Sequence, residues 1–72
     1  MDEKRLHWVK LSLREHHAYN RDDEHLGSLR QQRVGTFMHW CWYQDADVWM
    51  SPGCVDEMVQ KRKELYREMI RK

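Results

Sequence analysis

The side chains best suited to chemistry in this 72-residue sequence are five histidines and two cysteines. His39 and Cys41 stand two apart, so they point the same way from a strand, and Cys54 follows them. The fourth ligand of a zinc site would have to come from His16, His17 or His25. Structural zinc sites pair their ligands at short spacings, and no C-x-x-C or H-x3–5-H pair is present. We therefore expect no metal site, and we expect both cysteines to be reduced and packed as small apolar residues. We expect His39 to be a buried neutral ring, which would resist protonation and so destabilise the fold in acid.

A catalytic interpretation has little to rest on. Cys41 beside His39 supplies a nucleophile and a base, but no third residue and no oxyanion-hole motif accompany them. The carboxylates at 22–24 are typical of a solvated helix start, and the three glycines are isolated, so no loop cradles a phosphate. We expect no catalytic residue and no cofactor.

Charge and composition limit the class of protein. Lysine and arginine number 13 against 12 acidic residues, so the net charge is +1 and no strong field favours nucleic acid or anionic lipid. Four tryptophans, three tyrosines and five methionines supply the bulk of a small core. The start is charged and no long apolar run follows, so we expect a complete cytoplasmic protein with no membrane span and one domain over residues 1–72.

The last third of the chain predicts a helix over residues 52–71. Ser51 can cap its N-terminus, and Pro52 suits the first helical position. The apolar residues follow helical spacing: Val55, Met58, Val59, Leu65, Tyr66, Met69 and Ile70.

The middle of the chain predicts an aromatic β-hairpin. Residues 36–43 and 48–50 are rich in strand formers and flank a polar turn at 44–47, so Trp42 would face Trp49. One face would carry Met38, Trp40, Trp42 and Trp49, and the other Phe37, His39, Cys41, Tyr43 and Val48. Both faces need cover, which one helix cannot give.

The first third is ambiguous. Residues 6–11 fit a strand or a helix, and 12–15 have the spacing of a capping box. Helices are expected at 13–19 and 23–33, with Leu26 and Leu29 facing inward. The predicted fold class is α+β: a small single domain whose aromatic hairpin packs between short N-terminal elements and a long C-terminal helix.

Residues 29–33 suggest one function for this plan. Two short helices before a hairpin resemble the small excisionase-like winged-helix proteins, and Arg30, Gln31 and Arg33 then resemble a recognition helix. This implies DNA binding. The expected hairpin tip, however, carries Asp45 and Asp47 and no basic residue, so it would repel phosphate.

Protein recognition is the preferred interpretation. Tryptophan and arginine dominate the energetics of protein interfaces, and the residues expected to bind a partner are Trp8, Arg30, Arg33, Trp40, Trp42 and Trp49. We expect at least two of the tryptophans to be buried and the remainder to form an aromatic patch. The patch could equally be a dimer interface, so the oligomeric state stays open.

The chain also resembles, in kind, small phage-encoded regulators that dock on host RNA polymerase. The resemblance rests on the short chain, the aromatic segment 37–43 and the lack of an active-site motif. It implies a noncatalytic protein that binds a polymerase subunit and inhibits or otherwise modulates transcription, with no cofactor.

Overall fold

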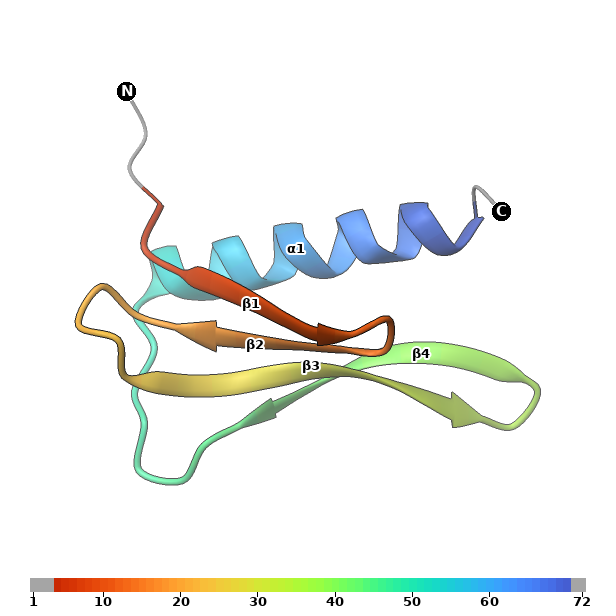
Figure 1. Ribbon diagram of the computed structural model, residues 1–72, viewed down its shortest axis with the longest axis horizontal. Coiled ribbons are helices and arrows are strands. Elements are labelled where there is room, and N and C mark those ends of the chain that lie inside the picture. The colour runs from red at the N-terminus through yellow and green to blue at the C-terminus, as the bar shows by residue number, and fades with distance from the viewer. Residues whose placement is uncertain (1–3, 71–72) are drawn as a thin grey trace.

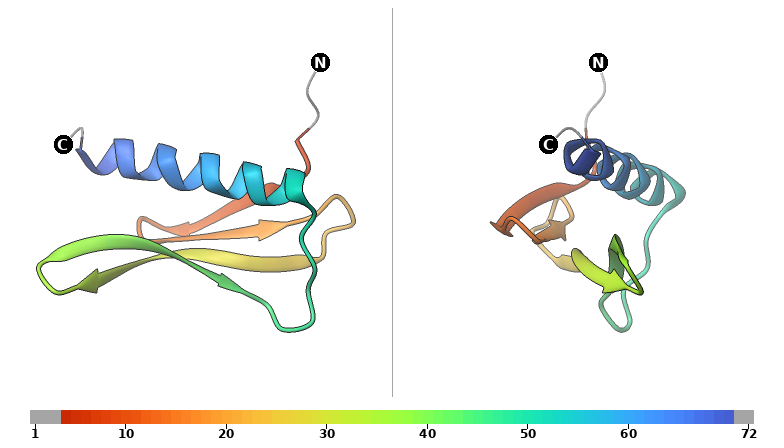
Figure 2. Two further views of the ribbon diagram at one scale, coloured as in Figure 1. Left: turned by 180° about the vertical axis from the view of Figure 1, so that it is seen from behind. Right: turned by 90° about the vertical axis from the view of Figure 1, so that its right-hand side faces the viewer.

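The computed structural model describes residues 4–70, which form a four-stranded antiparallel sheet and one helix (Figure 1). The elements are β1 (His7–Ser12), β2 (Glu15–Tyr19), β3 (His25–Val34), β4 (Phe37–Gln44) and α1 (Pro52–Ile70). The strands lie in chain order, so each pairs only with its neighbours in sequence. The helix crosses one face of the sheet and leaves the other uncovered, as the end-on view of Figure 2 shows. The α+β fold class is confirmed.

Strand β4 matches the predicted aromatic strand, but its partner does not match. Residues 48–50 form no strand, and β4 pairs with β3, so that Trp42 faces Leu29 instead of Trp49. A two-residue turn between Val34 and Phe37 closes this hairpin, and its first residue, Gly35, has φ +64. Glycine adopts positive φ without steric cost, so the tight turn forms on the N-terminal side of the aromatic strand. The predicted pairing of β4 with 48–50 is wrong.

The helices predicted at 13–19 and 23–33 are also wrong. These residues form β2, most of β3 and the turns beside them, and the open choice at 6–11 resolves as the strand β1. The Ser12 hydroxyl caps no helix; it accepts a hydrogen bond from the Arg14 N–H within the β1–β2 turn (3.1 Å). The winged-helix interpretation required two helices before the hairpin, so its structural premise fails.

The core lies between α1 and the covered face of the sheet. Its buried apolar residues are Leu6, Leu26, Leu29, Trp40, Met50, Met58 and Leu65. Trp8 and Trp42 pack edge to face beside this cluster, with ring centroids 6.2 Å apart. The indole of Trp42 passes directly over Gly27 of β3, where the absence of a side chain makes room for the ring.

Polar contacts fix the helix at both ends. Ser51 caps the N-terminus as predicted, because its hydroxyl accepts from the Cys54 N–H (3.3 Å). The Glu57 carboxylate accepts two backbone N–H bonds from residues 5–6, at 2.7 and 3.0 Å, and so ties the start of the chain to the helix. Near the other end, the Tyr66 hydroxyl accepts from the Trp40 N–H on the outer edge of β4 (3.0 Å). The predicted helix is confirmed over Pro52–Ile70, and residue 71 lies outside the described residues.

Candidate functional site

The tryptophans expected to bind a partner do not form one surface. Trp40 is 3% exposed, and Trp8 and Trp42 pack beside it against the core. Trp49 alone lies open, 79% exposed, in the loop before α1. Three of the four rings are needed to fill the space between helix and sheet, so the predicted aromatic patch is not assembled.

Arg30, Gln31 and Arg33 do not share a surface either. Successive side chains of a strand alternate between faces, so Arg30 of β3 lies on the uncovered face and the other two on the opposite side. Arg30 donates to the Ser28 hydroxyl (3.1 Å) and lies over the ring of Tyr43 (5.3 Å). A helix could present all three side chains to DNA, but a strand places Arg30 on one face of the sheet and Gln31 and Arg33 on the other.

Exposed apolar side chains instead gather at one end of the molecule. The β1–β2 turn, the β3–β4 turn and the C-terminal end of α1 lie at this end in Figures 1 and 2. Five large side chains there are between 56% and 81% exposed: Leu11, Leu13, Val34, Phe37 and Ile70. We call these five residues the apolar end. This concentration of exposed apolar residues makes this end of the molecule the candidate interaction site.

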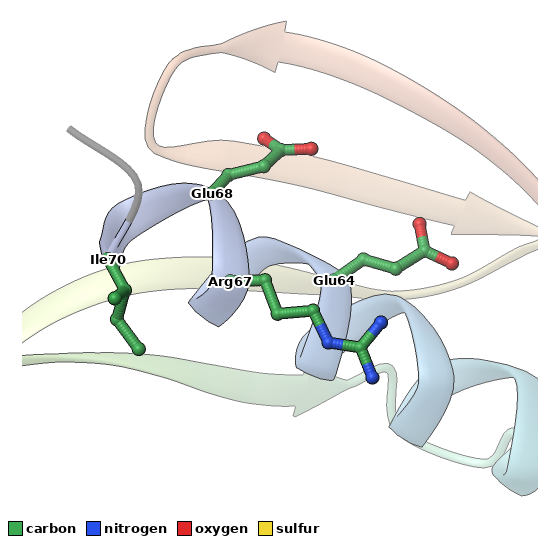
Figure 3. Close-up of a pocket in the computed structure, with 4 residues that line it drawn as sticks. All are labelled: Glu64, Arg67, Glu68 and Ile70. Atoms are coloured by element: carbon green, nitrogen blue, oxygen red, sulfur yellow. The ribbon is translucent and has the colours of Figure 1, made fainter.

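Charged side chains lie beside Ile70, the residue that α1 contributes to the apolar end. Glu64, Arg67, Glu68 and Ile70 line an open hollow of about 470 Å³ (Figure 3). Figure 3 shows Glu68 and Ile70 leaving the last turns of α1 on different sides, with Arg67 extending back along the helix near Glu64. The arrangement places an apolar side chain next to groups of both charges, as at the polar rim of a protein interface.

A smaller hollow of about 80 Å³ leads from the apolar end towards the core, and Leu13, His16, Trp40 and Met69 are among the residues that line it. The His16 ring is buried against the Trp40 ring, with centroids 5.5 Å apart. Burial lowers the pKa of His16, and the nearby lysines at 61 and 10 lower it further. The imidazole that lines this hollow is therefore harder to protonate than that of an exposed histidine.

His39 is not the buried histidine that we expected. It is exposed on β4, with its Nδ1 3.4 Å from the Tyr66 hydroxyl, and His16 takes the buried position. Alternation explains the difference, because Trp40 next to His39 faces the helix and His16 pairs with Leu29 on the covered face.

The cysteines and His39 do not come together. Cys41 is a half-buried residue of β4 opposite Arg30, whereas Cys54 packs against the core from the first turn of α1. Within residues 4–70, no group of three or more histidine, cysteine or acidic side chains is arranged to hold a metal ion.

The sequence interpretation missed the apolar end, although one signal was present. Apolar residues occur at both turns: Leu11 and Leu13 stand on either side of Ser12, the last residue of β1, and Val34 and Phe37 flank a Gly-Thr pair. Apolar side chains at turn tips have no core to enter, so they are exposed unless a partner covers them.

No family model, curated protein or solved structure matches this chain. No helix among residues 4–70 is long and apolar enough to cross a membrane.

Proposed function

We propose that this chain is a small noncatalytic regulatory domain that binds a protein partner through its apolar end. The observation that carries the proposal is that five exposed apolar side chains belong to two turns and a helix end that lie at the same end of the molecule. Burying one such side chain is worth about 1.5–3 kcal/mol, so two or three of them could anchor a complex. Phe37 supports the proposal further, because aromatic residues are enriched at the centres of interfaces.

RNA polymerase is the first partner to test. The resemblance to small phage-encoded regulators favours it, and such a protein would act in the cytoplasm to inhibit or modulate transcription. The net charge of +1 suits a contact that relies on apolar burial more than on electrostatic steering.

The test is binding of the purified, immobilised chain to purified bacterial RNA polymerase and, in parallel, capture from a host lysate with and without nuclease. A Leu13→Ala/Phe37→Ala double variant should weaken the complex at least about tenfold, because it removes two anchors. Trp49→Ala is the matched control, since Trp49 is an equally exposed aromatic residue in the loop at the other end of the molecule. It should bind like the unmodified chain.

Three results would contradict the proposal. Binding lost only in Trp49→Ala would move the site to the loop before α1. Unchanged binding by the double variant, with an unchanged melting temperature, would remove the apolar end from the contact. Partners that disappear with nuclease and with rising salt would favour the alternative of nucleic-acid binding.

A further inference from the structure

Four side chains on the uncovered face of the sheet form a continuous hydrogen-bonded chain. Glu15 and His17 come from β2, His25 from the start of β3, and Asp45 follows β4 directly. The Nε2 of His17 donates to Glu15 Oε2 (2.6 Å), and the Nδ1 of His25 donates to Asp45 Oδ2 (2.5 Å). Between the two rings, His17 Nδ1 lies 2.7 Å from His25 Nε2. Each imidazole is thus held by a carboxylate on one nitrogen and presents the other nitrogen to its neighbour.

The two ring nitrogens that face each other are not the ones that contact the carboxylates. A neutral imidazole has one N–H, and a ring that donates this N–H to a carboxylate keeps a lone pair on its other nitrogen. In that tautomer the lone pairs of His17 Nδ1 and His25 Nε2 point at one position between the two rings.

We propose that His17 Nδ1 and His25 Nε2 are two ligands of a binding site for one divalent transition-metal ion of the Zn²⁺ type. The ion would lie between these two nitrogens, which are 2.7 Å apart. Imidazole ligands of metals almost always donate their second N–H to a carboxylate or carbonyl, and Glu15 and Asp45 provide this arrangement on both rings. This proposal is independent of the protein-binding function and uses a different surface.

The geometry needs only a small adjustment to accept the ion. With Zn–N bonds of about 2.0–2.1 Å and a tetrahedral angle, the two nitrogens would stand about 0.6 Å further apart than now. The His25 side chain is about one-third exposed, so it has room to move. Because the two imidazoles are the only protein ligands proposed, water would complete the coordination.

The charge around the rings also favours a cation. Glu15 and Asp45 carry two negative charges, and Arg30, whose Nε lies 3.5 Å from Glu15 Oε2, supplies one positive charge. The two carboxylates and the one guanidinium together leave a net charge of −1 around the rings.

The first test is titration of the full chain with Zn²⁺ in a non-chelating buffer, followed by calorimetry and by NMR of the histidine rings. We expect one ion per chain, with ring shifts at His17 and His25 and none at His39. A His17→Gln/His25→Gln variant should lose this binding, whereas His39→Gln, an exposed histidine on β4, should retain it. Cys41→Ser should bind equally, since no thiol takes part.

The carboxylates supply a second test in which both ligands stay in place. Glu15→Gln and Asp45→Asn should each weaken binding by about 10–100-fold, as found for residues that orient metal ligands. No saturable binding at millimolar Zn²⁺ would overturn the proposal. Ring shifts confined to other histidines, binding that survives the His17→Gln/His25→Gln double variant, or binding that Cys41→Ser abolishes would overturn it as well.

Discussion

Replacing Gly27 with alanine should destabilise this fold strongly, because β3 has no room for a methyl group at that position. A Cβ there would lie 2.5 Å from the Tyr43 carbonyl oxygen and 2.7 and 2.9 Å from two ring atoms of Trp42. The carbonyl belongs to the backbone of β4, which is paired with β3, and the indole is held against Trp8. Neither neighbour can move without loss of other contacts.

The expected loss of folding free energy in Gly27→Ala follows from overpacking, which costs about 1–3 kcal/mol. Because both neighbours are rigid, this variant should lie near the upper value. A domain of this length has a total stability of roughly 4–11 kcal/mol. In small domains each 1 kcal/mol lowers the melting temperature by about 4–8 °C, so a loss of about 3 kcal/mol lowers it by about 12–24 °C.

Thermal and urea unfolding followed by circular dichroism would measure the effect. Gly53→Ala is the matched control: the three atoms nearest its added methyl all belong to the guanidinium of Arg5, the closest at 2.7 Å, and a flexible side-chain end can swing away. Gly53 lies in the first turn of α1, where alanine suits the helix better than glycine. We therefore expect the control to melt within a few degrees, about 4 °C, of the unmodified chain. If Gly27→Ala melted at the same temperature as Gly53→Ala, the close approach of Trp42 to β3 would be refuted.

Three further predictions concern single contacts. Burial lowers the pKa of His16, so as pH falls through 6.5 the unfolded chain binds a proton that the folded chain does not bind. The melting temperature should therefore be lower at pH 5.5 than at pH 7.5, and His16→Gln should reduce this difference. Tyr66→Phe removes the acceptor of the Trp40 N–H and should cost about 0.5–1.5 kcal/mol in urea unfolding; an unchanged midpoint would contradict this role of the hydroxyl. Glu57→Ala leaves the backbone N–H groups of residues 5–6 without their acceptor and should cost about 1–3 kcal/mol; amide exchange at these two positions should become faster, and unchanged protection would count against the contact.

The C-terminal helix could be predicted because local signals suffice for it. Ser51 and Pro52 mark its start, and its apolar stripe follows a helical period that no other structure satisfies over such a length. The strand at 36–43 was also recognisable from its aromatic residues. Its partner was not, because the sequence offers turns on both sides and only the tertiary structure chooses Gly35.

The strand β3 could not be predicted because its sequence also fits a helix. Leu26 and Leu29 stand three apart, which fits a helix face, yet all four residues at 26–29 are buried in the central strand. Burial on both sides of a strand hides the alternation that normally identifies it. The arginines and glutamines at 30–33 are good helix formers, and pairing with β4 overrides that preference.

The hydrogen-bonded chain of Glu15, His17, His25 and Asp45 could not be predicted for a different reason. His17 and His25 are separated by a turn and by a register irregularity in the β2–β3 pair, so their spacing in the sequence does not predict their contact. Their carboxylate partners are similarly distributed, since Asp45 belongs to the loop after β4. Only the order of the strands brings these groups to one face.

That strand order also governs how the chain can fold. Because each strand pairs with the one synthesised just before it, the sheet can grow one hairpin at a time, without the long search that distant pairings require. The helix comes last in the chain, so the growing sheet presents the Trp40 face without its cover until α1 has been made. Docking of α1 is then the step that buries the core, and until that step the nascent chain is the form most exposed to aggregation.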